Sequence, residues 1–275
     1  MEIRGKTLVI TGGASGIGRA LAVAAVTRGA RVAIADRDLE GAEETAKLAT
    51  ESCAAGSLCT AHPLDVSSLE QWRSLREAVL AEYGQVDGII NNAGISFSGH
   101  IEDTSYEQLE RVMSINFMGM VYGSKEFLPL IKTRPQGLIA NVSSVFGLFP
   151  RKRQGAYCAS KYAIRGFTEE LAQELKDTKV LVTSIHPGHI GTNIVQNARD
   201  EGNVVGVELS EQEQDMWTQA FKAMGMIPER AARIILDGIS QDRRKIMVGR
   251  DAVRGDRLSR IAPVLFADAA NKAAL

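Results

Sequence analysis

The sequence has few of the residues on which disulfide frameworks and catalytic metal sites depend. Its three cysteines are an odd number, and no two of them form a C-x-x-C pair. Its four histidines include no H-E-x-x-H motif and no comparable spacing of metal ligands. We therefore expect no catalytic metal in this protein.

Long hydrophobic runs and an excess of one charge are also absent. No apolar stretch approaches the roughly 18 residues that a membrane-spanning helix needs, so we expect no membrane span. The chain reaches a strand-like run at residues 7–10 directly after a short segment of mixed charge, which is unlike a secretory signal peptide. The formal net charge of -1 does not indicate a nucleic-acid partner. Together, these absences predict a soluble protein of a reducing compartment, the cytoplasm.

The sequence does contain a regular alternation of short apolar runs and longer helical patterns. The runs are continuously apolar, which is typical of strands covered on both faces. Because helices separate them, we expect right-handed crossovers and a parallel sheet. The predicted fold class is α/β, a doubly wound Rossmann fold with about seven parallel strands and helices on both faces. The predicted strands are residues 7–10, 31–35, 58–63, 86–90, 137–142, 180–185 and 245–248. The predicted helices are residues 17–28, 39–52, 69–83, 106–130, 157–176 and 228–241.

No linker rich in proline, glycine or serine divides this pattern, so we expect residues 1–275 to form a single domain. Residues 188–227 interrupt the alternation, and connections of that length are uncommon unless they carry function. We interpret them as a substrate-loop insertion. Its centre, residues 209–224, has an apolar stripe that either packs on the core or forms a lid over an apolar substrate. Residues 250–275 form a C-terminal extension that could pack on its own core, cover a neighbouring subunit's pocket or touch a membrane.

A glycine-rich turn follows the first predicted strand and opens the first predicted helix. Gly12, Gly16 and Gly18 permit a tight turn and a close approach of the backbone to phosphate, and the helix N-terminus favours negative charge. The second strand ends at Asp36, whose carboxylate could bind ribose hydroxyls and would repel a 2′-phosphate. NAD is therefore the expected cofactor. NADP is the less favoured alternative. It stays open because Arg37 could reach a 2′-phosphate.

Tyr157 and Lys161 lie one helical turn apart and should share one face of a helix. An ammonium group at that place would lower the tyrosine pKa from its usual value of about 10. A tyrosine poised nearer neutrality can exchange a proton with a hydroxyl group. The pair alone also fits an ordinary solvated helix face. Other motifs in the sequence are needed to distinguish that interpretation from an acid/base pair.

Seven motifs in a fixed order together resemble the short-chain dehydrogenase/reductase family, over residues 6–249. The motifs are Thr11–Gly18, Asp65-Val66, Asn91–Gly94, Asn116, Ser144, Tyr157 with Lys161, and Pro187-Gly188. The resemblance implies an oxidoreductase in which Tyr157 is the acid/base and Ser144 binds the substrate oxygen. It also implies that Lys161 lowers the tyrosine pKa and binds the nicotinamide ribose, while Asn116 holds a water in a proton relay.

The resemblance further implies which residues contact the cofactor, with Asp65 and Val66 on the adenine and Thr192 on the carboxamide. The expected cofactor contacts are Gly12, Ser15, Gly16, Ile17, Gly18, Asp36, Arg37, Asp65, Val66, Asn92, Ala93, Gly94, Tyr157, Lys161, Pro187, Gly188, Ile190 and Thr192.

The expected substrate is a secondary alcohol or its ketone, uncharged and bulky, such as an aromatic or steroid-like molecule. The candidate substrate contacts are Ser96, Ser144, Phe146, Tyr157, His189 and Ile194. Two alternatives remain open, a 3-oxoacyl thioester reductase, which the basic residues 151–153 would suit, and a non-catalytic dinucleotide-binding regulatory protein. The resemblance also implies a homo-oligomer, either a tetramer or a dimer.

Overall fold

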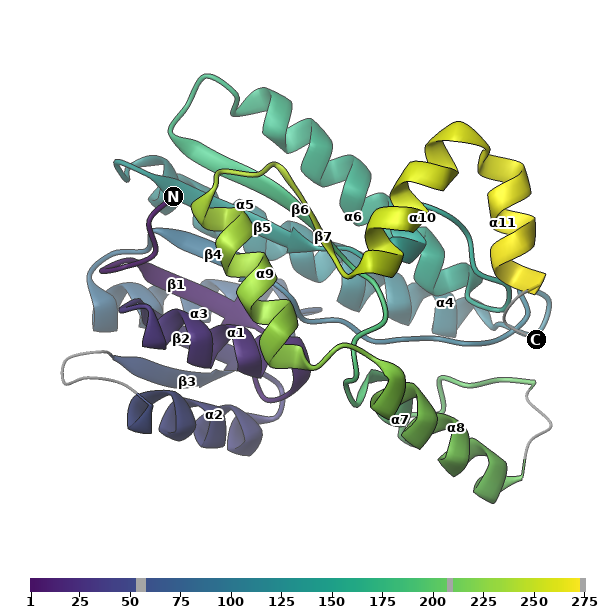
Figure 1. Ribbon diagram of the computed structural model, residues 1–275. Helices are drawn as coiled ribbons and strands as arrows, with labels where there is room; N and C mark the ends of the chain where they lie inside the picture. Colours follow the sequence, from purple (N-terminus) through teal and green to yellow (C-terminus); the bar gives the residue numbers. More distant parts are fainter. Residues whose placement is uncertain (53–57, 207–209, 273–275) are drawn as a thin grey trace.

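The computed structural model describes residues 1–52, 58–206 and 210–272, in which strands and helices alternate along the chain (Figure 1). The strands form one parallel sheet in the order β3-β2-β1-β4-β5-β6-β7, which confirms the predicted Rossmann architecture. Chain order reverses between β1 and β4, and in such sheets the cofactor crevice lies at this switch point. The strands are β1 (Thr7–Thr11), β2 (Arg31–Asp36), β3 (Cys59–Pro63), β4 (Gly88–Asn91), β5 (Gly137–Val142), β6 (Val180–Pro187) and β7 (Lys245–Val248).

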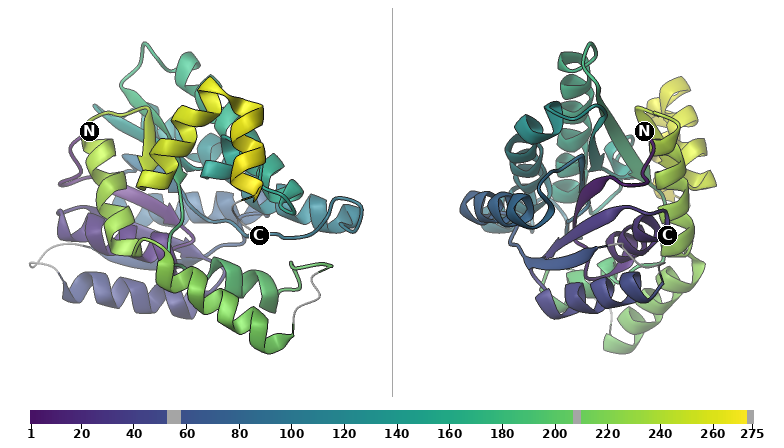
Figure 2. Two further views of the ribbon diagram at one scale, coloured as in Figure 1. Left: turned by 45° about the vertical axis from the view of Figure 1, so that its right-hand side comes forward. Right: turned by 90° about the vertical axis from the view of Figure 1, so that its left-hand side faces the viewer.

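Helices cover both faces of the sheet (Figure 2). One face carries α1 (Gly16–Thr27), α2 (Leu39–Glu51) and α9 (Pro228–Ser240). The opposite face carries α3 (Leu69–Tyr83), α5 (Gly119–Lys132) and α6 (Gly155–Glu174), with α4 (Tyr106–Met113) packed beside α6.

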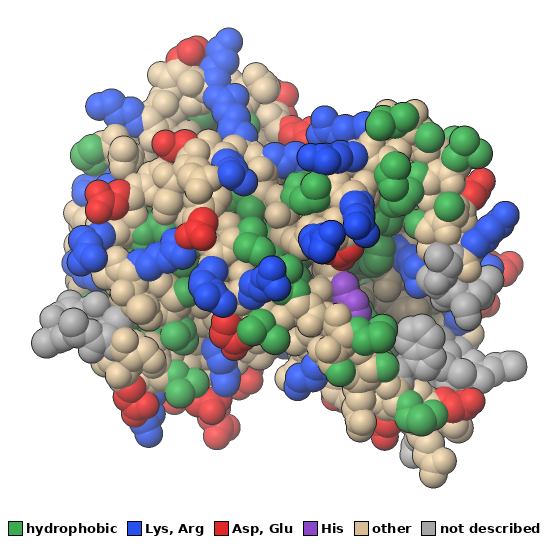
Figure 3. Space-filling model, viewed as in Figure 1, with side chains coloured by type: hydrophobic (Ala, Val, Ile, Leu, Met, Phe, Trp, Pro, Cys, Tyr) green, Lys and Arg blue, Asp and Glu red, His purple; other side chains and the backbone are tan. Residues whose placement is uncertain are grey.

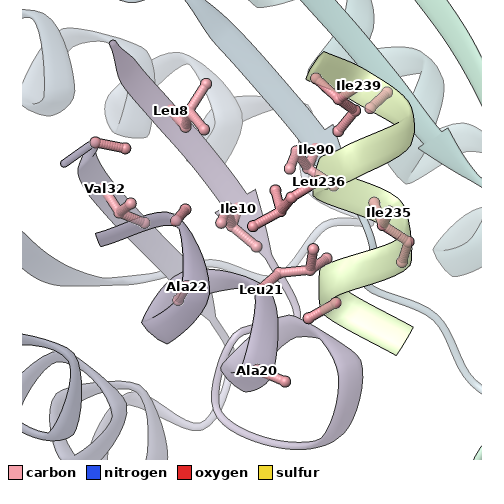
Figure 4. Close-up of a cluster of buried hydrophobic side chains, with 14 of the residues drawn as sticks. Leu8, Ile10, Ala20, Leu21, Ala22, Val32, Ile90, Ile235, Leu236 and Ile239 are labelled. Carbon is pink, nitrogen blue, oxygen red and sulfur yellow. The ribbon is translucent and has the colours of Figure 1, made fainter. Parts of the chain in front are cut away.

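Each face of the sheet packs its own hydrophobic layer. On the first face, Leu8 and Ile10 of β1 meet Leu21 of α1 and Leu236 of α9, and all four side chains are fully buried (Figure 4). Burying one such side chain contributes about 1.5–3 kcal/mol. These contacts hold the start of α1 against the end of β1, where the glycine-rich turn lies.

The predicted helix over residues 106–130 is interrupted in the structure. A π-helical turn, Ser114–Met118, joins α4 to α5. Helix α4 begins with a capping box, in which the side chains of Ser105 and Gln108 each bond to the backbone N–H of the other residue. Wider turns of this kind are frequent at functional sites. Here the turn contains Asn116, whose side chain is buried in the protein interior.

The predicted substrate-loop insertion contains two helices, α7 (Ile194–Asp200) and α8 (Glu211–Met224). Met216 and Met224 are 63% and 76% exposed, so the alternative in which this stripe packs on the core is wrong for these two residues. Phe221 is partly buried against the ring of His189. Leu209, where the predicted segment begins, and the side chain of Trp217, a member of the stripe, lie outside what the structure describes.

The C-terminal extension folds into two helices, α10 (Arg250–Ile261) and α11 (Pro263–Lys272), which pack against each other. They lie above the carboxyl end of the sheet and opposite α7 and α8 (Figure 1). In the ranges that the structure describes, no helix has the length and apolar character to cross a bilayer.

Candidate active site

A cleft of about 1530 Å³ opens at the carboxyl ends of the strands. Figure 3 shows the molecule hollowed on this side, between the C-terminal helices and the α7–α8 segment. Almost all of the residues predicted to contact cofactor or substrate line this cleft. The two exceptions among the predicted residues are Gly18, which lies beneath the glycine-rich turn, and Asn116, which lies behind the cleft wall.

The glycine-rich turn leaves no room for side chains where it meets neighbouring backbone. A Cβ on Gly18 would lie 2.0 Å from the carbonyl oxygen of Gly12, so only glycine fits there. Gly12 has a φ of +67°, which favours glycine, and a Cβ there would lie 2.8 Å from Cα of Ala93. Ser15 is the N-cap of α1, and its side chain makes no capping hydrogen bond. The first turn of α1 therefore keeps backbone donors for an anionic ligand.

Asn92 supports the turn from the end of β4. Its Nδ2 donates to the carbonyl oxygens of Thr11 at 2.9 Å and Gly12 at 3.2 Å. The backbone N–H of Ala93 also donates to Oγ1 of Thr11 at 3.1 Å. Asn92, which the sequence placed among the cofactor contacts, therefore uses its amide donors to hold the glycine-rich turn in shape.

Asp36 connects the end of β2 to the same turn. Its Oδ2 accepts a hydrogen bond from the Ala14 N–H at 2.9 Å, and its Oδ1 accepts one from the Asp38 N–H at 3.0 Å. A carboxylate held in this way keeps acceptor capacity for ribose hydroxyls. Of the two residues expected to contact the adenine, Asp65 is exposed and Val66 is buried, and both line the cleft.

The guanidinium of Arg37, the residue after Asp36, already has an ion-pair partner. It pairs with Glu201, which follows α7. Glu201 also accepts a hydrogen bond from Arg111 of α4 at 2.7 Å. Burial would raise the pKa of Glu201, but its hydrogen bonds to Arg111 and Arg37 outweigh burial and hold the pKa below its usual value. We call Arg37, Glu201 and Arg111 the ion-pair bridge, because it joins β2, α7 and α4 along the cleft.

The acid/base candidates Tyr157, Ser144 and Lys161 are buried together at the floor of the cleft. Burial raises the pKa of Tyr157 to about 12, although a hydrogen bond with Ser144 acts in the opposite direction. Contrary to the prediction, the structure raises the pKa of this tyrosine rather than lowering it. Lys161 Nζ lies 5.5 Å from the centroid of the tyrosine ring and donates instead to the Val142 carbonyl at 3.1 Å. Burial also lowers the pKa of Lys161 to about 8, so the lysine is still mainly protonated at neutral pH but loses its charge more readily than an exposed lysine.

Asn116 uses its whole side-chain amide within the protein. Oδ1 accepts from the Ile95 N–H at 2.8 Å, while Nδ2 donates to the Ile95 carbonyl at 3.0 Å and to Ser160 Oγ at 3.0 Å. A Cβ on Gly94 would lie 3.0 Å from Asn116 Oδ1 and 3.4 Å from Lys161 Nζ. The side chain therefore ties the loop after β4 to α6 next to the lysine. Its Nδ2 donors already have partners, so the side chain has no donor left for the predicted water.

Sequence reasoning missed two residues that shape the site. His186 is buried, and its Nδ1 is 3.0 Å from the carbonyl oxygen of Ser144, so it helps to fix the backbone there. Burial lowers the pKa of His186 to about 4, so this histidine is neutral near neutral pH. Asp251 of α10 accepts a hydrogen bond from the His189 N–H at 2.7 Å and fills the space beside Gly188. Neither residue belongs to a local motif, since both act through contacts between distant parts of the chain.

The substrate candidates lie around the tyrosine. Phe146 and Tyr157 are in edge contact, with ring centroids 6.5 Å apart. Nε2 of His189 is 2.7 Å from the Phe221 carbonyl oxygen, so this histidine is already bound to α8. Ser96 and Ile194 complete the predicted set on the cleft wall. Among the described residues, no group of three or more His, Cys, Asp or Glu side chains is arranged to hold a metal ion.

A model of the family described as short chain dehydrogenase matches residues 6–203. The chain belongs to the short-chain dehydrogenase/reductase family. SadH of Mycobacterium tuberculosis is 37% identical over 264 residues, which cover 94% of this chain and 92% of that protein. The Bos taurus dehydrogenase/reductase SDR family member 7B is 34% identical over 251 residues, covering 90% of this chain and 74% of its own.

Solved structures of short-chain dehydrogenases/reductases have the same fold. One from Burkholderia phymatum, in complex with NAD, has a TM-score of 0.85 at 27% identity and covers 96% of each chain. Levodione reductase has a TM-score of 0.78 at 26% identity, covering 91% of this chain and 97% of its own. The protein is thus an oxidoreductase of this family with a nicotinamide dinucleotide cofactor. The glycine-rich turn, the open N-terminus of α1 and the carboxylate of Asp36 fit such a group.

Proposed function

We propose that this short-chain dehydrogenase/reductase interconverts a secondary alcohol and a ketone with NAD(H), on a bulky hydrophobic, aromatic or steroid-like substrate. The observation that carries the proposal is the burial of Tyr157, Ser144 and Lys161 in one cleft with the glycine-rich turn. The cofactor supplies hydride exchange when it is bound. The proton transfer and the stabilisation of charge on the substrate oxygen are proposed for side chains of this chain.

In the proposed ketone reduction, the Tyr157 hydroxyl donates its proton to the substrate oxygen. A tyrosine with a pKa of about 12 is protonated at neutral pH, which suits this direction. The Ser144 hydroxyl donates a hydrogen bond to the same oxygen and stabilises the charge that develops on it. In the reverse direction Tyr157 must first lose its proton, and Lys161 is the nearby cation that would favour this.

Replacing Tyr157 with Phe tests the acid/base assignment. The variant keeps the ring and its contact with Phe146 but has no proton to transfer. We expect kcat to fall by about 10²–10⁴-fold while the Kd for NADH stays within twofold of the wild type. Turnover is measured by NADH absorbance and binding by fluorescence titration. Turnover at the wild-type rate would contradict the assignment.

The preference for NAD over NADP is proposed from the ends of β2 and α7. Asp36 presents a carboxylate where a 2′-phosphate would approach, and Glu201 occupies the guanidinium of Arg37. Parallel titrations with NADH and NADPH should give at least a tenfold smaller Kd for NADH. Equal Kd values for NADH and NADPH would contradict the proposed preference for NAD.

The basic residues Arg151, Lys152 and Arg153 line the cleft and favour a second candidate, a 3-oxoacyl thioester reductase. Two of these charged groups already have partners, because Arg151 donates to the Ala270 carbonyl and Arg153 to the Gly206 carbonyl. Comparing an acetoacetyl thioester with an uncharged aromatic ketone would separate the two candidates. The regulatory alternative, a protein that binds a dinucleotide without catalysis, has less support because Asn116, Ser144, Tyr157 and Lys161 are all present.

A further inference from the structure

The C-terminal hairpin of α10 and α11 lies outside the residues that the family model matches, yet it touches the active site. Asn271 of α11 binds the loop after β5 twice. Its Oδ1 accepts from the Lys152 N–H at 2.7 Å, and its Nδ2 donates to the Pro150 carbonyl at 3.3 Å. Arg151 also donates to the Ala270 carbonyl at 3.4 Å. The hairpin is therefore attached to the loop that carries Phe146 and Phe149.

Phe149 occupies a socket that the two helices of the hairpin form. On one side is Gly255 of α10, where a Cβ would lie only 2.6 Å from the Phe149 ring. On the other side is Phe266 of α11, whose ring centroid is 4.8 Å from that of Phe149 at an angle of 80°. Such edge-to-face contacts are favourable beyond the area that they bury. The missing side chain at Gly255 and the ring of Phe266 together fix the position of Phe149.

A row of aromatic rings continues from this socket to the reaction centre. Phe149 contacts Phe146 with centroids 5.9 Å apart, and Phe146 contacts Tyr157 at 6.5 Å. Phe146, Phe149 and Tyr157 line the cleft, whereas Phe266 and Gly255 are not among the described residues that line it. An effect of Phe266 or Gly255 on substrate would thus be transmitted through Phe149.

We infer that the C-terminal hairpin is the outer support of the substrate site, and that Phe266 and Gly255 are positioning residues that determine how large an apolar substrate the site accepts. Without this support, Phe149 and Phe146 lose their fixed place beside Tyr157, and the apolar wall that a bulky substrate needs becomes disordered. Small substrates need less of this wall and are less affected. The inference about substrate size rests on the proposed function, whereas the support of the loop does not.

Hydrogen exchange tests the support directly, without any substrate. The amides of Leu148 and Phe149 both donate to the Val145 carbonyl, at 2.9 and 3.2 Å, and report on the loop. In Phe266→Ala we expect exchange of the segment 145–152 to be about fivefold faster than in the wild type. Val264→Ala is the matched control, since Val264 lies on the same helix and is 70% exposed. Phe266→Tyr keeps the ring and should exchange as the wild type does.

Kinetics with alcohols of graded size test the effect on substrate. With NAD and 1-(2-naphthyl)ethanol, Phe266→Ala should raise KM about fivefold and change kcat by less than twofold, while KM for 2-butanol stays unchanged. Gly255→Ala should also raise KM for the naphthyl alcohol, because the added methyl group displaces Phe149.

The results that would overturn the inference are specific. Exchange of the segment 145–152 that is the same in Phe266→Ala and Val264→Ala would show that the hairpin does not support the loop. Equal changes of KM for both alcohols, or a loss of kcat alone, would show that the hairpin does not select substrate size. If the wild type oxidises neither alcohol, the proposed function is at fault, and the exchange result still decides whether the hairpin supports the loop.

Discussion

The burial of Lys161, which we propose takes part in the reaction, makes the fold less stable. Its side chain is buried, and burial lowers its pKa from 10.5 to about 8. The folded-state pKa lies below the unfolded value, so the folded protein binds the proton less tightly. Keeping the ammonium inside the protein is therefore unfavourable at all pH values below about 8, and this cost fades as the pH rises from about 8 toward 10.5.

Replacing Lys161 with Met should make the protein more stable and inactive. At pH 7 we expect the free energy of unfolding to rise by about 1–3 kcal/mol, because the desolvated charge is removed. The gain should shrink at pH 9.5, where the wild-type lysine is already largely neutral in the folded state. Urea denaturation of both proteins at the two pH values measures this. Lys125→Met on the exposed surface of α5 is the control, and a gain that did not change with pH would contradict the explanation.

The residues that we propose as catalytic could be located from the sequence because short motifs encode them, but their protonation behaviour could not. The spacing of Tyr157 and Lys161 predicts a shared helix face, and the structure places them there. Their pKa values depend on how deeply the cleft buries them and on the Val142 carbonyl that binds the lysine. Burial results from the packing of α6, β5 and the loop after β4, which no local pattern encodes.

At the scale of elements, strands were easier to predict than the interruptions of helices. The first strand, predicted over residues 7–10, is Thr7–Thr11 in the structure, because a continuous apolar run is a strong local pattern. The π-helical turn at Ser114–Met118 has no comparable pattern, since its residues suit an ordinary helix equally well. It forms where Asn116 must turn inward to bind the backbone of Ile95.

The ion-pair bridge leads to a prediction about cofactor choice. Glu201→Gln removes the charge that holds Arg37, so the guanidinium becomes available to a 2′-phosphate. We expect the Kd for NADPH to fall by about threefold to fivefold, as suits the release of a partly exposed ion pair, with the Kd for NADH changed by less than twofold.

Asp215→Asn is the matched control for the bridge. Asp215 is an exposed carboxylate that pairs with Arg199 of α7, at 2.7 Å, and it is not part of the bridge. Fluorescence titration of the three proteins at one ionic strength gives the comparison. A weaker affinity of Glu201→Gln for NADPH, or an equal effect of Asp215→Asn, would show that the bridge does not control Arg37.

At the scale of the whole molecule, the surface of α4 and α6 supports the proposed homo-oligomer. Tyr106 and Leu109 of α4 and Tyr162 of α6 are large side chains left exposed by the fold. Leu109→Glu should shift the protein to a smaller species in size-exclusion chromatography with light scattering, because a charge in an apolar interface is costly. Leu80→Glu on α3, where Leu80 is similarly exposed, should leave the mass unchanged. A monomeric wild type, or the same shift in Leu80→Glu, would contradict the proposal.

The family match ends at residue 203, and the α10–α11 hairpin begins 47 residues later at Arg250. The groups proposed to transfer the proton all precede that end, whereas Gly255 and Phe266, which hold the outer aromatic ring, follow it. The proposed proton-transfer groups and the outer support of the substrate wall thus lie on separate stretches of chain. Changes near the C-terminus would then alter how firmly that wall is held, while the proposed proton-transfer groups stay unaltered.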